Sequence, residues 1–123
     1  MGALAKDIMG GGTSAGQSKA INGRVATSLT AAGTTISDAL QLNATHNDIS
    51  TCASGAGVKL FNGEIADEMT VYNGGANQCI VYPHGSTGTI NQLSAGSGIT
   101  LAQYTMCKFK RITSTAWRAH LSA

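Results

Sequence analysis

Short apolar runs separated by glycine-rich turns are the feature that most limits how this chain can fold. The clearest case is residues 68–83, where the runs 69–72 and 79–82 flank Asn-Gly-Gly-Ala-Asn at 73–77. Asn and Gly tolerate the positive φ that a tight reversal requires. Pro83 has no N–H to donate to a ladder, so it ends the second run. The pattern predicts a β-hairpin over residues 68–83.

Similar short runs follow one another along the chain. The further candidate strands are residues 39–43, 46–52, 58–61, 89–93, 99–102, 105–112 and 116–121. The last two of them are predicted to form a hairpin around Thr113-Ser114-Thr115. In residues 116–121, period-two alternation places Trp117, Ala119 and Leu121 on an inward face and Arg118 and His120 on the other. Short strands with Gly-rich turns predict an all-β domain, either a small β-sandwich or a barrel of short antiparallel strands.

Residues 1–30 differ from the rest because they show no sustained periodicity and contain three consecutive glycines at 10–12. We therefore predict an extended N-terminal arm over residues 1–30 and a β domain over residues 31–123. An arm that buries little of itself usually buries side chains on a neighbour. The candidate apolar anchors for such a neighbour are Leu4, Ile8, Met9, Ile21 and Val25.

The charge is low and unevenly placed. Charged residues make up 11% of the chain, and the net charge of +2 is too small to predict nucleic-acid binding. A weakly charged surface repels copies of itself weakly, which favours permanent assembly. All six acidic residues lie at or before Glu68. The later cluster Lys108, Lys110 and Arg111 is therefore a candidate secondary contact for an acidic partner.

The cysteines and histidines show no pattern of a chemical site. Cys52, Cys79 and Cys107 are odd in number and lie in apolar runs, which predicts buried thiols that pack as small hydrophobes. The histidines are too widely spaced to indicate a metal site. No apolar segment approaches the length of a membrane span. We therefore expect no enzymatic activity, no cofactor, no metal and no membrane partner.

Several segments resemble a pattern found in small β structural proteins of tailed-bacteriophage virions. They are LTAAGTT at 29–35, DALQL at 38–42, GAGVKL at 55–60, VYNGGAN at 71–77 and TAW at 115–117. The resemblance covers about residues 10–121. It implies a head-decoration (cement) protein that is made in the host cytoplasm and bridges subunits on the capsid exterior. It also implies a homotrimer whose N-terminal arm reaches the major capsid protein.

Two other functions remain open at this point. One is a structural module of the tail or fibre, in which related β modules occur. The other is a carbohydrate-binding β module with Trp117, Tyr72 and Tyr82 as stacking platforms. Aromatic side chains such as these more often lie in the hydrophobic core.

Overall fold

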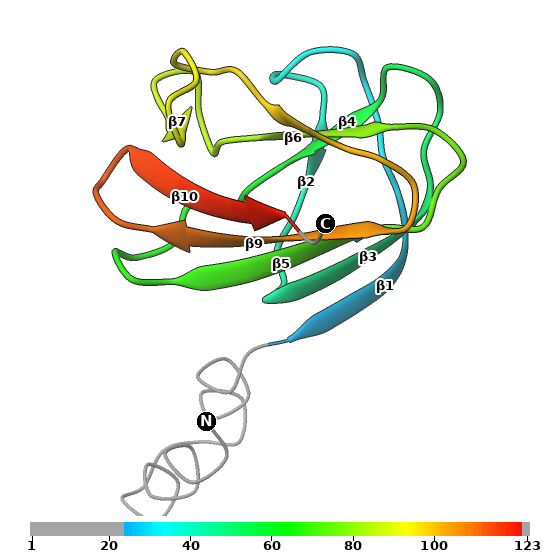
Figure 1. The fold of residues 1–123 in the computed structure, drawn as a ribbon, viewed down its shortest axis with the longest axis horizontal. Helices are drawn as coiled ribbons and strands as arrows, with labels where there is room; N and C mark the ends of the chain where they lie inside the picture. Colours follow the sequence, from blue (N-terminus) through cyan, green and yellow to red (C-terminus); the bar gives the residue numbers. More distant parts are fainter. Residues whose placement is uncertain (1–23, 122–123) are drawn as a thin grey trace, which may run out of the picture.

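The computed structural model describes residues 24–121, which form β-strands and no helix (Figure 1). The all-β prediction is confirmed for this part of the chain. Nothing between residues 24 and 121 has the length and apolarity of a membrane-spanning helix. The strands are β1 (Val25–Thr30), β2 (Leu40–Gln41), β3 (His46–Thr51), β4 (Gly57–Lys59), β5 (Glu68–Asn73), β6 (Cys79–Tyr82), β7 (Thr89–Ile90), β8 (Ile99–Leu101), β9 (Thr105–Arg111) and β10 (Ala116–Leu121).

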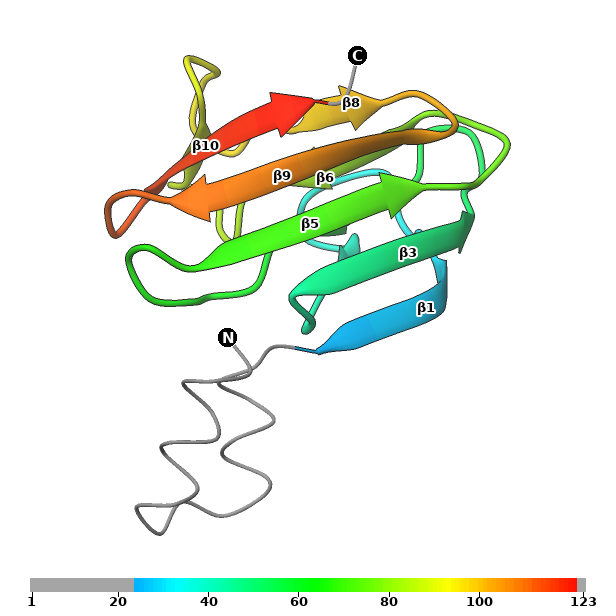
Figure 2. The ribbon, with the colours of Figure 1, turned by 60° about the horizontal axis from the view of Figure 1, so that its bottom comes forward.

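The strands form two mixed sheets. The six-stranded sheet has the order β1-β3-β5-β9-β10-β7, and the four-stranded sheet has the order β2-β4-β6-β8. From β1 to β6 the chain alternates between the sheets, and each of β1, β2, β3 and β4 pairs in parallel with the strand two places later. The first six strands therefore wind as a solenoid-like stack (Figures 1 and 2). Antiparallel pairing enters with β8 beside β6 and with β9 between β5 and β10.

This winding corrects two predictions. The expectation of antiparallel strands is wrong for β1 to β6, and the hairpin predicted over residues 68–83 does not form. Both strands of that hairpin exist as β5 and β6, but β5 pairs with β3 and β9 while β6 pairs with β4 and β8. The loop between them crosses from one sheet to the other.

Hydrogen bonds of a buried asparagine explain why the loop crosses over. The Asn73 side chain is fully buried, and its Nδ2 donates to Asn77 O and to Leu101 O, both at 2.9 Å. Its Oδ1 accepts from Gly75 N at 2.9 Å. A Cβ on Gly75 would lie 2.6 Å from Cys52 N, so glycine here permits close approach to the end of β3. The loop is held against β3 and β8 instead of reversing.

The hairpin predicted at the C-terminal end of the chain is confirmed. β9 and β10 pair in antiparallel register, with Arg111 opposite Trp117 and Cys107 opposite Leu121. The turn is held by Ala116 N, which donates to Thr113 Oγ1 at 3.0 Å.

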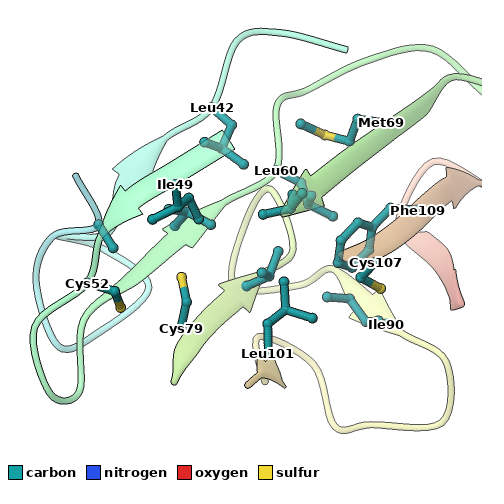
Figure 3. Packing of buried hydrophobic residues seen from close by; sticks show 14 of the residues in the cluster. Leu42, Ile49, Cys52, Leu60, Met69, Cys79, Ile90, Leu101, Cys107 and Phe109 are labelled. Carbon is teal, nitrogen blue, oxygen red and sulfur yellow. The ribbon is translucent and has the colours of Figure 1, made fainter. Parts of the chain in front are cut away.

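One hydrophobic core lies between the two sheets (Figure 3). Trp117 is 1% exposed, so its predicted inward orientation is confirmed, and all three thiols are buried as expected. The largest fully buried apolar side chains come from both sheets and their connections; they are Trp117, Phe109, Leu42, Ile49, Leu60, Met69, Ile90, Leu101, Val58, Val71 and Val81. The core therefore couples the sheets into one unit.

The first strand begins inside the segment that we assigned to the arm. Residues 25–30 form β1, the edge strand of the six-stranded sheet. The anchors Leu4, Ile8, Met9 and Ile21 lie outside the described residues. Val25 is the described anchor, and it lies on β1 with 71% of its surface exposed.

Candidate interaction surface

The outer face of β9 presents two lysines to solvent. Along this strand Cys107, Phe109 and Arg111 are buried, whereas Lys108 and Lys110 are exposed. The alternation is that of a strand with one face on a core and one in water. Both lysines therefore project from the outer face of the six-stranded sheet.

The neighbouring strand β10 adds two more basic side chains to the same face. Arg118 lies opposite Lys110, and His120 lies opposite Lys108. Both residues are exposed. Directly paired side chains on one face of an antiparallel ladder have Cβ atoms about 5 Å apart. We call these four residues, Lys108, Lys110, Arg118 and His120, the basic face.

One carboxylate partly balances this charge. Glu68 on β5 lies opposite Lys110, and its Oε1 is 3.6 Å from Lys108 Nζ. Both side chains of this ion pair are well exposed, so the pair contributes little. Among residues 24–121, Lys110 and Arg118 form no ion pair. The basic face thus keeps a positive excess.

Arg111 does not belong to the basic face. It is 9% exposed and lies on the opposite side of β9 from Lys108 and Lys110. Its guanidinium stands 5.9 Å from the centre of the Trp117 ring. It donates to four oxygens around it, which are Thr113 O at 3.2 Å, Asn62 Oδ1 at 3.0 Å, Gly63 O and Ser114 O. Arg111 therefore ties two loops to the core and is not free to reach a partner.

The three histidines lie on different elements, with His46 on β3, His84 in the loop after β6 and His120 on β10. His46 Nε2 is 2.7 Å from Asp48 Oδ1 on the outer face of β3. His84 lines a small cavity of about 60 Å³ beside Trp117. No group of three or more His, Cys, Asp or Glu side chains suited to a metal is found between residues 24 and 121.

Two of the buried thiols, Cys79 and Cys107, are held in their neutral form. Burial raises the pKa of the Cys107 thiol to about 11. Burial, together with the neighbouring Cys52, also raises the pKa of Cys79. Because the thiolate is the nucleophile, such thiols are unreactive near neutral pH.

The aromatic platforms of the carbohydrate-binding alternative are not assembled. Trp117 is buried in the core, so its ring is not available to a sugar. Tyr72 belongs to β5 in one sheet and Tyr82 to β6 in the other. Trp117, Tyr72 and Tyr82 therefore do not form a common stacking platform.

A cavity opens at the other end of the molecule, where β1 and β2 form the edges of the two sheets. It measures about 130 Å³ and lies between β1 and residues 41–47. Fully buried Asn47 is part of its lining, and the Oδ1 of this residue has no hydrogen-bond partner among residues 24–121.

Comparisons with protein-family models, curated proteins and solved structures find no match for this chain. The basic face is therefore defined by geometry alone. Sequence reasoning selected Lys108 and Lys110 but missed their association with Arg118 and His120. The period-two alternation within residues 105–112 and 116–121 contains the signal, because it separates Arg111 from the two lysines.

Proposed function

We propose that this chain is a structural protein of a tailed-bacteriophage virion, which decorates the capsid exterior and bridges capsid subunits. The observation that carries the proposal is the basic face, a set of exposed charges on a regular part of the sheet. The resemblance described above supplies the class of partner, the major capsid protein.

The basic face suits an acidic protein surface. β9 is paired on both sides, by β5 and by β10, so its side chains are held in a fixed array. A fixed array of like charge steers a partner of opposite charge and sets the docking register, while contributing less to affinity. Apolar anchors of the arm, Leu4, Ile8 and Met9, would then supply apolar burial at the same neighbour.

Bridging also requires assembly of the protein itself. We infer self-association, because the low overall charge opposes it only weakly, and the resemblance implies that the assembly is a homotrimer. The two sheets enclose one core and each has two distinct edge strands, which favours a sandwich over a closed barrel. An open sandwich leaves β1, β2, β7 and β8 as edges at which copies can meet.

The test compares binding to purified undecorated heads by co-sedimentation. The variant carries Lys108→Gln, Lys110→Gln and Arg118→Gln, and the matched control carries Lys59→Gln, a lysine of the four-stranded sheet. We expect at least roughly tenfold weaker binding of the triple variant in low salt. The difference should shrink near 0.5 M salt, where exposed charges are screened. Thermal melts should show both variants folded.

Three results would contradict the proposal. Unchanged binding by the triple variant would show that the basic face does not contact the capsid. Binding to isolated tails and not to heads would favour the tail or fibre module. Retention on duplex DNA that is stronger than retention on heads would replace the protein partner by nucleic acid.

A further inference from the structure

Two of the three buried thiols lie side by side at the end of the core that the crossover loop covers. Cys52 directly follows β3, and Cys79 is the first residue of β6. Their side chains lie within hydrogen-bonding distance of each other (Figure 3). Cys107 lies on β9 beside Phe109, away from this pair (Figure 3). The odd number of cysteines therefore divides into one pair and one single thiol.

The backbone on both sides of Cys79 is held around the Cys52 sulfur. Cys52 Sγ is 3.3 Å from Gln78 O, the carbonyl immediately before Cys79. The same sulfur is 3.7 Å from Ala56 O. Ala56 O also accepts a hydrogen bond of 3.2 Å from Ile80 N, immediately after Cys79. Backbone contacts therefore keep the two thiols together, although they belong to distant parts of the sequence.

We propose that Cys52 and Cys79 close to an intramolecular disulfide under oxidising conditions, which joins the end of β3 in one sheet to the start of β6 in the other. Disulfides between two packed sheets occur in other β-sheet domains. The bond would fasten the crossover loop, because Asn77 Nδ2 in that loop already donates to Cys52 O at 2.9 Å. A disulfide also restricts the unfolded chain, so it should stabilise the folded state.

The reaction needs an oxidant, for which a low-molecular-weight disulfide is sufficient. The Cys52 thiolate attacks this reagent, which forms a mixed disulfide on Cys52 and releases one thiolate of the reagent. The Cys79 thiolate then attacks the Cys52 sulfur and releases the second thiolate. Both protein sulfurs are oxidised, both sulfurs of the reagent are reduced, and the two thiol protons pass to the released thiolates.

Burial makes this reaction slow while the fold is closed. Cys79 is fully buried and Cys52 is 3% exposed, and burial and the neighbouring Cys52 raise the pKa of Cys79. The reaction therefore starts when the surface turn at residues 53–56 or the loop at residues 74–78 opens locally. Once opened, a thiol is about half ionised near pH 8.5, which sets the pH of the test.

The disulfide does not depend on the proposed function. A protein made in a reducing cytoplasm, as that function requires, would keep both thiols during synthesis and acquire the bond after release. Binding to heads can fail while the bond still forms, and the bond can fail to form while binding persists. The two proposals are therefore tested separately.

Treatment of the full-length protein with cystamine near pH 8.5 tests the pair. The intact mass should show the loss of two hydrogens in the parent and in the control Cys107→Ala. Cys79→Ala should not show this loss, because a mixed disulfide on Cys52 then has no neighbouring thiol to displace the reagent. Cys52→Ala is the second variant and should behave in the same way, and thermal melts show whether each variant is folded. Digestion with trypsin and chymotrypsin separates the three cysteines and identifies the bonded peptides.

Several results would overturn the proposal. They are a parent protein without an internal disulfide after prolonged treatment, a mixed disulfide that persists on Cys52, a bond from Cys52 to Cys107, and a bond between copies. The oxidised parent should melt at least about 5 °C above the reduced parent, and this difference should be absent in Cys79→Ala. An equal or lower Tm of the oxidised parent would show that the bond does not fasten the fold.

Discussion

At the scale of single residues, Arg111 is a buried basic side chain whose hydrogen bonds are all made within the protein. Arg111 is almost buried, and its planar guanidinium donates to several oxygens at once. A lysine could not reproduce that geometry. The hydrogen bonds of Arg111 stabilise the two loops at this end of the sheet. Arg111 therefore has a structural role, although it lies in a basic segment of the sequence.

Trp117→Ala should destabilise the protein strongly. The ring is 1% exposed, lies beside Arg111 and is among the largest buried side chains in the core. Truncating such a side chain costs about 3–5 kcal/mol. Thermal and urea unfolding measure the change, and Trp117→Phe should lose clearly less. A Trp117→Ala protein that melts within a degree or two of the parent would show that the ring contributes little to the core.

The stability of the protein should fall between about pH 9 and pH 11. The Cys107 pKa rises from 9.0 to about 11 on folding, so the folded state holds the proton more tightly. The unfolded state then loses its proton first as the pH rises, which lowers the free energy of unfolding by about 1–3 kcal/mol across this window. Urea unfolding at pH 8 and pH 10.5 measures the change. In Cys107→Ala the dependence on pH should be shallower, and an unchanged slope would assign the effect to other groups.

At the scale of elements, two pairs of consecutive strands joined by short loops gave one hairpin and one crossover. β9 and β10 are joined by residues 112–115 and pair directly. β5 and β6 are joined by the glycine-rich residues 74–78 and enter different sheets. The difference lies in Asn73, whose side-chain bonds fasten the loop to β8 and to the residues after β5.

Asn73→Ala should therefore destabilise the crossover. The change leaves Leu101 O, Asn77 O and Gly75 N without their side-chain partner. Each such group costs about 1–3 kcal/mol where water does not reach it. Urea unfolding measures the loss, and exposed Gln78→Ala in the same loop should stay within about 0.5 kcal/mol of the parent. Equal stability of the two variants would show that the crossover does not depend on this side chain.

At the scale of the whole molecule, the solenoid-like stack has two different ends. One end finishes with the paired strands β9, β10 and β7, and β9 and β10 carry the basic face. The other end finishes with the edges β1 and β2 and the cavity between them. We propose that the first end meets a partner.

An N-terminal deletion tests the proposed arm. Removing residues 2–20 should leave Tm unchanged but weaken binding to undecorated heads, because it removes Leu4, Ile8 and Met9. Light scattering of the full-length protein at micromolar concentration should give the mass of a trimer. A monomer mass, or unchanged binding by the deletion variant, would contradict the respective proposal.

The sequence alone determined where most strands lie and which of their side chains face inward, because alternation is a local property of each strand. It identified the inward position of Trp117, the buried thiols and the hairpin of β9 and β10. The tertiary structure decided which strands pair. A short loop rich in Asn and Gly can either reverse the chain or cross between sheets, and the choice rests on contacts between distant segments, such as that of Asn73 with Leu101. The same register decided that Arg118 and His120 join Lys108 and Lys110, while Arg111 lies in the core.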